Sequence, residues 1–81
     1  MSGVAAESPL DRLGPDEGGR IARVEGDPPV ARRLMELGLV PGTVVRVVRR
    51  APFGDPIELV VRGVHLSLRR SEARLIHVER G

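Results

Sequence analysis

The chain has 81 residues, of which 13 are basic and 11 acidic, giving a formal net charge of +2. Its length allows one domain with a thin core, and the lack of cysteine excludes disulfides and thiolate metal sites. All of the basic residues are arginines, so the isoelectric point near 10.9 reflects arginine chemistry and does not indicate a strongly basic surface. This charge balance weakens a nucleic-acid-binding interpretation, which requires a clustered positive excess.

The first residues carry no pattern of regular structure. Residues 1–9 are small and polar, which predicts a disordered tail, and residues 10–81 are expected to form a single domain. The start lacks the basic and apolar regions of a signal peptide, and no apolar run approaches the roughly 20 residues that span a bilayer. We therefore expect a cytoplasmic protein. The segment Leu10–Leu13 is predicted to be a short ordered segment that precedes a glycine-rich turn. The alternation of apolar and polar residues over 20–24 predicts a first strand.

A short helix is predicted next. Asp27 is a good N-cap, and Pro28 suits the first helical position. Val30, Leu34 and Leu37 follow at spacings of four and three residues, which places them on one face of a helix. We expect this stripe to face the core.

The helix should end in a Schellman motif. Gly38 fits the C′ position, Leu39 is placed to make the accompanying apolar contact, and Pro41 prevents continuation. The β-branched run at 43–50 then predicts a strand, and the turn residues at 51–55 interrupt it.

A β-hairpin is predicted over 56–68. Residues 56–62 alternate between apolar and other side chains, and Arg62–Gly63 can form a two-residue loop. That loop sets a register in which three apolar cross-strand pairs share one face, as a buried sheet face requires. The pairs are Val61 with Val64, Leu59 with Leu66, and Ile57 with Leu68.

The C-terminal part completes a mostly β fold. Ser71 begins a predicted helical turn, and residues 75–79 form a last strand with Ile76 and Val78 inward. About five short strands around an aliphatic core, with one short helix, predict a closed or nearly closed small barrel, because closure removes exposed edges.

No constellation of catalytic residues is found. The serines outside the tail, Ser67 and Ser71, lie in a strand and at a helical start, and no glycine pattern matches a phosphate-binding loop. His65 and His77 alternate with apolar residues, so we expect both to face solvent. We predict neither catalytic residues nor a cofactor.

The histidines and carboxylates could also form a metal site. Asp55, His65, His77 and Glu79 are ligand types that suit zinc or ferrous iron, yet none of them is at a ligand spacing. We therefore predict no metal site built from these side chains alone.

Paired arginines and one aromatic residue are the candidates for a binding surface. The pairs Arg32–Arg33, Arg49–Arg50 and Arg69–Arg70 are either solvated surface charges or a docking patch, and arginine is favoured at interfaces. Phe53, the only aromatic residue, lies in a turn, where it either folds back over the barrel or anchors a partner.

Three segments together resemble one family. Residues 33–43 read RLMELGLVPGT and look like the R-L-x-E-L-G-L-x-P-G-T signature of the FeoA family, and 50–57 and 62–73 continue the resemblance in order. The resemblance spans roughly 10–79 and implies an SH3-like barrel with a short inserted helix. It also implies a cytoplasmic accessory of ferrous-iron uptake that acts on FeoB, a membrane transporter with a cytosolic GTPase domain.

The same fold resembles the C-terminal domain of DtxR-type repressors. Those proteins carry a helix-turn-helix and a dimerisation region, for which 81 residues leave no room, so a free-standing FeoA-like protein is expected.

The sequence therefore predicts a protein that docks on the cytosolic part of an FeoB-like transporter. We expect no nucleic-acid partner and no membrane insertion; recruitment to the inner face of the membrane and homo-oligomerisation stay open. Two alternatives remain: a nucleic-acid-binding barrel, which would show steep salt dependence but lacks an aromatic stacking platform, and an iron-sensing domain, which ferrous iron would stabilise. The predicted contact residues are Arg49, Arg50, Pro52, Phe53, Gly54, Asp55, Arg69 and Arg70, supported by Arg32, Arg33 and Glu36.

Overall fold

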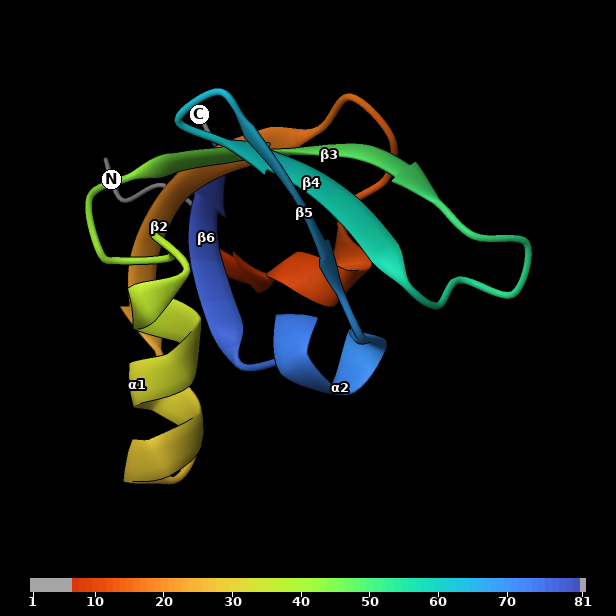
Figure 1. The fold of residues 1–81 in the computed structure, drawn as a ribbon. Helices are drawn as coiled ribbons and strands as arrows, with labels where there is room; N and C mark the ends of the chain where they lie inside the picture. The colour runs from red at the N-terminus through yellow and green to blue at the C-terminus, as the bar shows by residue number, and fades with distance from the viewer. Residues whose placement is uncertain (1–6, 81) are drawn as a thin grey trace.

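A computed structural model describes residues 7–80 of the chain. The strands form one antiparallel sheet in the order β1-β6-β2-β3-β4-β5, which curls into a small barrel whose edges are β1 and β5 (Figure 1). The mostly β prediction is confirmed. Within the described residues, no helix is long and apolar enough to cross a membrane. The elements are β1 (Glu7–Pro9), the 3₁₀ helix η1 (Leu10–Arg12), β2 (Gly18–Val24), α1 (Pro28–Glu36), β3 (Val44–Arg50), β4 (Ile57–Val61), β5 (Val64–Leu68), α2 (Arg70–Ala73) and β6 (Ile76–Arg80).

The core is aliphatic and receives buried side chains from β2 to β6 and from η1, α1 and α2. Alternate residues of β3 and β4 point inward, and the sole aromatic residue of the chain is not among the buried side chains. Burying each valine, leucine or isoleucine side chain contributes about 1.5–3 kcal/mol, so aliphatic packing is the main stabilising contribution in this chain without disulfides. The buried apolar residues are Leu10, Leu13, Ile21, Leu34, Leu39, Val45, Val47, Ile57, Leu59, Val61, Leu68, Ala73, Ile76 and Val78.

The β4–β5 hairpin has the predicted loop and register. Arg62 and Gly63 have φ angles of 52° and 77°, as the two central residues of a type I′ turn require. The three predicted cross-strand pairs are all present. Burial of the face is uneven, however: Val61 is buried, whereas Val64 is 54% exposed. Val64 lies on β5, which has a neighbouring strand on one side only.

Helix α1 ends in the predicted Schellman motif. The Gly38 N–H donates to the Met35 carbonyl at 2.9 Å, and the Leu39 N–H donates to the Leu34 carbonyl at 3.3 Å. Gly38 has a φ of 101°, in the left-handed region that favours glycine. The prediction that Leu37 faces the core is wrong, since it is 43% exposed. Leu37 is the C-cap, and the reversal of the chain after it brings Leu39 into the core instead.

The N-cap of α1 differs from the expectation in one respect. Asp27 occupies the cap position with an extended backbone, but its side chain makes no capping hydrogen bond. A cap side chain normally accepts from the second or third helical N–H. Here Pro28 and Pro29 fill the first two positions and carry no N–H, so the second-position donor does not exist.

The predicted disordered tail is wrong for its last three residues. Glu7–Pro9 form β1, which pairs with β6 through Glu7 opposite Glu79 and Pro9 opposite His77. A proline is compatible with this strand because β1 is at the edge of the sheet. Residues 1–6, the rest of the predicted tail, lie outside the described residues. The sheet therefore has six strands, one more than predicted.

Gly38→Ala should lower the free energy of unfolding by about 1–2 kcal/mol, because a side chain disfavours the left-handed backbone at that position. Space is not the obstacle, since the nearest atom to a β-carbon there is Cγ1 of Val61 at 4.0 Å. Urea denaturation measures the change. Gly14→Ala is the matched control because Gly14 is not among the glycines with positive φ; equal effects of the two substitutions would contradict the backbone argument.

Candidate functional site

The β3–β4 loop, residues 51–56, projects away from the sheet on the side opposite α1 (Figure 1). Two backbone hydrogen bonds close it: the Ala51 N–H donates to the Pro56 carbonyl at 3.1 Å, and the Gly54 N–H donates to the Ala51 carbonyl at 2.7 Å. Phe53 is 93% exposed in this loop. It does not fold back over the barrel, which rules out the first of the two alternatives for this residue.

The loop meets the start of α2. The backbone N–H of Arg70 donates to Oδ1 of Asp55 at 3.1 Å, which joins two segments 15 residues apart. A β-carbon at Gly54 would lie 3.8 Å from Cδ of Arg70 and 3.9 Å from Nη2 of Arg50, so both arginine side chains lie beside the loop. We call residues 49–55 together with Arg69 and Arg70 the loop surface.

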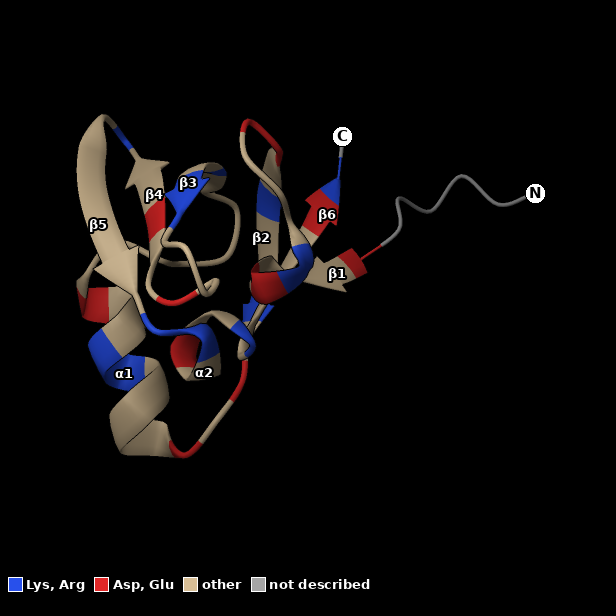
Figure 2. Cartoon of the chain, turned by 90° about the vertical axis from the view of Figure 1, so that its right-hand side faces the viewer, with Lys and Arg blue, Asp and Glu red and all other residues tan. Residues whose placement is uncertain are grey.

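The loop surface carries positive charge that is only partly compensated. Arg49 pairs with Glu58 at 3.3 Å, but within residues 7–80 no carboxylate lies within 4.0 Å of the guanidinium groups of Arg50, Arg69 or Arg70. The guanidinium of Arg50 instead donates to the Leu13 carbonyl at 3.1 Å. Figure 2 shows arginine at the end of β3 and again between β5 and α2. The loop surface therefore combines an exposed aromatic ring with arginines that have no carboxylate partner among the described residues.

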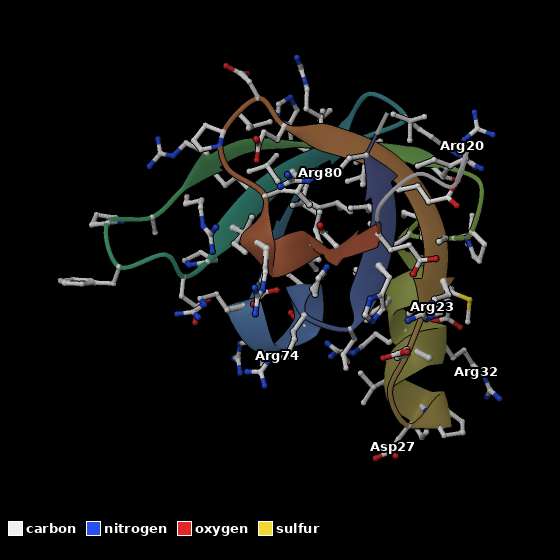
Figure 3. The ribbon with its side chains drawn as sticks, turned by 180° about the vertical axis from the view of Figure 1, so that it is seen from behind. Arg20, Arg23, Asp27, Arg32, Arg74 and Arg80 are labelled. Atoms are coloured by element: carbon white, nitrogen blue, oxygen red, sulfur yellow. The ribbon has the colours of Figure 1, made fainter. Side chains whose placement is uncertain are left out.

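The predicted helix residues are not all part of this surface. Arg32 lies on the outer side of α1, across the molecule from the loop (Figure 3). Arg33 points the other way and pairs with Glu72 of α2 at 2.7 Å. Glu36 is exposed and belongs to none of the ion pairs within residues 7–80. The loop thus lies close to Arg69 and Arg70, whereas Arg32 lies on the other side of the molecule.

Glu72 is a positioning residue that the sequence analysis did not single out. Its carboxylate accepts from the backbone N–H of Arg69 at 3.0 Å and from the guanidinium of Arg33 at 2.7 Å. The Arg69 N–H first, and the Arg33 guanidinium after it, hold the pKa of Glu72 below the ordinary value of 4.5. Glu72 therefore fixes the first turn of α2, and with it Arg69, against α1. A glutamate three residues after the N-cap fits the capping-box pattern. That pattern normally begins with serine or threonine, and here the N-cap is Arg69, so the sequence did not reveal it.

The two histidines differ in environment. His65 is exposed, as predicted, whereas the side chain of His77 is only 15% exposed and its Nε2 lies 3.0 Å from Oε1 of Glu25. The solvent-facing prediction is wrong for His77 because β1, which was not predicted, pairs with β6 at that residue. The hydrogen bond from Arg23 first, and then the neighbouring His77 imidazole, lower the pKa of Glu25.

The metal-ligand types considered from the sequence do not come together. Within residues 7–80, no group of three or more histidine, cysteine, aspartate or glutamate side chains is arranged to hold a metal ion. Asp55 bonds to the backbone of Arg70 in the loop surface, while His77 faces Glu25 across the sheet.

Comparison with known proteins identifies the family. The model of the FeoA domain family matches residues 8–80. The chain belongs to the FeoA family. A curated relative, the Fe(2+) transport protein A/Fe(2+) transporter FeoB fusion protein of Porphyromonas gingivalis, is 41% identical over 59 residues, which cover 73% of this chain and 7% of that protein. The chain thus spans a small fraction of the length of that relative, and the family is associated with ferrous-iron transport.

Solved structures agree with the fold. The solution structure of FeoA from Chlorobium tepidum is 42% identical, with a TM-score of 0.83 over 90% of this chain and 70% of that chain. The zinc complex of Stenotrophomonas maltophilia FeoA, described as an SH3 domain protein, is 34% identical, with a TM-score of 0.75 over 86% and 87% of the two chains. A manganese-dependent transcriptional repressor, 21% identical, shares the fold over 45% of its length with a TM-score of 0.86. The predicted SH3-like fold and FeoA resemblance are confirmed.

Glu72→Gln should lower the free energy of unfolding at pH 7 by about 1 kcal/mol, because it removes the charge from two hydrogen bonds. Since folding lowers the pKa of Glu72, its stabilising effect is present above the unfolded value of 4.5 and is lost as the pH falls through the folded pKa. The difference between wild type and variant should therefore shrink below that pH. Denaturation at a series of pH values measures it, with Glu36→Gln as control; a difference that does not change with pH would contradict this assignment.

Proposed function

We propose that this FeoA-family chain is a non-catalytic accessory protein that docks on the cytosolic part of an FeoB-like ferrous-iron transporter. The observation that carries the proposal is the loop surface, which contains the outward-facing Phe53 and, in Arg69 and Arg70, two arginines with no carboxylate within 4.0 Å of their guanidinium groups among residues 7–80. The Porphyromonas gingivalis fusion supports the choice of partner, because its name joins Fe(2+) transport protein A and FeoB in one polypeptide.

The exposed ring of Phe53 is an unused source of binding energy. Burying a phenylalanine side chain contributes about 1.5–3 kcal/mol, and this ring is 93% exposed in the free chain. Aromatic residues and arginine are enriched at protein interfaces, where a few residues carry most of the binding energy. Phe53 can therefore enter a pocket of the partner while Arg69 and Arg70 contact carboxylates around it.

The internal hydrogen bonds of the loop surface favour docking without rearrangement. Asp55 holds the loop to the backbone of Arg70, and Glu72 holds Arg69 against α1 through Arg33. Such preorganisation reduces the entropy lost when a partner binds. Peptide recognition in a groove lined with aromatic residues, as used by proline-binding SH3 domains, does not apply, because Phe53 is the only aromatic residue of the chain.

Phe53→Ala should weaken binding to detergent-solubilised FeoB from the same organism by about 10- to 100-fold, since the anchor is lost. Arg70→Ala should weaken it less, by about 3- to 10-fold, and that loss should diminish at high salt because the contact is electrostatic. Isothermal titration calorimetry at two salt concentrations measures both. Arg50 is not used, because its guanidinium bonds to the Leu13 carbonyl and supports the fold.

Val44→Ala is the matched control for this experiment. Val44 is 61% exposed at the start of β3, the end of that strand away from the loop. Its truncation should leave the affinity unchanged, and circular dichroism should show all variants folded. If the wild type does not bind with or without GTP, direct docking is wrong. If it binds and both loop variants bind equally well, the contact lies elsewhere on the chain.

A further inference from the structure

Strand β5 has an unpaired edge. It ends the sheet order and pairs only with β4. In a hairpin with a two-residue loop, the residues flanking the loop, here Val61 and Val64, form a hydrogen-bonded pair, and bonded and non-bonded pairs then alternate along the ladder. The backbone N–H and C=O of His65 and Ser67 therefore point away from β4. Within residues 7–80, neither residue has a backbone hydrogen bond outside the sheet.

This edge lacks the features that usually block strand addition. Natural edge strands are protected by proline, charged side chains, bulges or very short length. The opposite edge, β1, has three residues and contains Glu7 and Pro9. Strand β5 has five residues, VHLSL, with no proline and no Asp, Glu, Lys or Arg, and its register with β4 is regular.

The side chains of β5 also leave apolar surface for an added strand to cover. Val64 is 54% exposed and Leu66 is only partly buried, although both alternate in phase with the buried Leu68. On the other face, His65 and Ser67 are exposed. A strand laid along this edge would thus gain main-chain hydrogen bonds and apolar contacts together.

The charges at the two ends of β5 indicate what kind of segment could pair with its free edge. Arg62 precedes the strand, and Arg69 and Arg70 follow it, with no carboxylate within 4.0 Å of their guanidinium groups among residues 7–80. A second copy paired antiparallel in full register would place Arg62 of one chain opposite Arg70 of the other. Like charges directly opposite are destabilising, so self-pairing is disfavoured and acidic ends are favoured.

We propose that the free edge of β5 binds an extended segment of a protein partner by strand addition, and that this segment has an uncharged β-branched centre with acidic residues at its ends. This proposal goes beyond the loop surface and does not depend on Phe53 or on the identity of the transporter.

The test uses the full chain, labelled with ¹⁵N, and a blocked synthetic peptide, Asp-Asp-Val-Thr-Val-Thr-Val-Asp-Asp. Nuclear magnetic resonance should show shifts of the His65 and Ser67 amides on titration. Ser67→Pro removes one outward N–H without breaking the ladder with β4, and should weaken binding at least tenfold. Ser67→Ala retains the N–H and should bind within twofold of the wild type. A peptide with lysine in place of each aspartate should bind more weakly.

Any of three outcomes would overturn the proposal. The peptide does not bind at millimolar concentration, the amide shifts are confined to the loop surface, or Ser67→Pro and Ser67→Ala bind the peptide equally well. Concentration-dependent shifts of the same amides in the free protein, with dimers in sedimentation equilibrium, would show that a second copy is the occupant instead. If Ser67→Pro does not fold, His65→Pro replaces it, with His65→Ala as its control, because His65 supplies the other outward N–H.

Discussion

The close approach of three backbones at Gly18 and Gly19 is the constraint on which the sheet depends. Strand β2 pairs on one side with β3, through Gly18 opposite Arg46, and on the other with β6, through Gly19 opposite Arg80. A β-carbon at Gly18 would collide with the carbonyl oxygen of Val45, and one at Gly19 would collide with that of Glu79. Only glycine permits both contacts. Strand β2 lies between β6 and β3 in the sheet, so it joins the strands β1 and β6 to the strands β3, β4 and β5. The contacts at Gly18 and Gly19 therefore hold together the two groups of strands that enclose the core.

Several large apolar side chains lie outside the thin core. The buried side chains are aliphatic, and the exposed large apolar side chains among the described residues are Met35, Leu37, Val44, Phe53 and Val64. Phe53, the largest of them, projects from a loop that is held to α2 through Asp55, and Val64 lies on the unpaired edge of β5.

Local chemistry explains which features could be predicted from the sequence. The Schellman ending at Gly38 and the register set by Arg62–Gly63 depend on residues close together in the chain, and both appear in the structure. Strand β1 could not be predicted, because three residues ending in proline show no alternation and acquire a partner only from β6, at the other end of the chain. The burial of His77 follows from that pairing and was missed for the same reason.

The candidate site could be predicted in composition but not in arrangement. The arginine pairs and Phe53 are visible in the sequence, yet the contact between Asp55 and Arg70 depends on how β4 and β5 return the chain to the loop. The separation of Arg32 from the other predicted residues has a similar origin. Helical periodicity places Arg32 and Arg33 on different faces, and only tertiary structure shows that Arg33 reaches Glu72 while Arg32 does not.

The loop surface and the β5 edge are connected by the chain itself. Leu68, at the end of β5, is buried, and the next two residues are Arg69 and Arg70 of the loop surface. Leu68 and Ala73 are thus core residues on either side of these arginines, which fixes where β5 ends and α2 begins. A partner that followed the β5 edge would therefore reach the arginines in a position set by the core, and the same hydrophobic contacts that stabilise the barrel orient both surfaces.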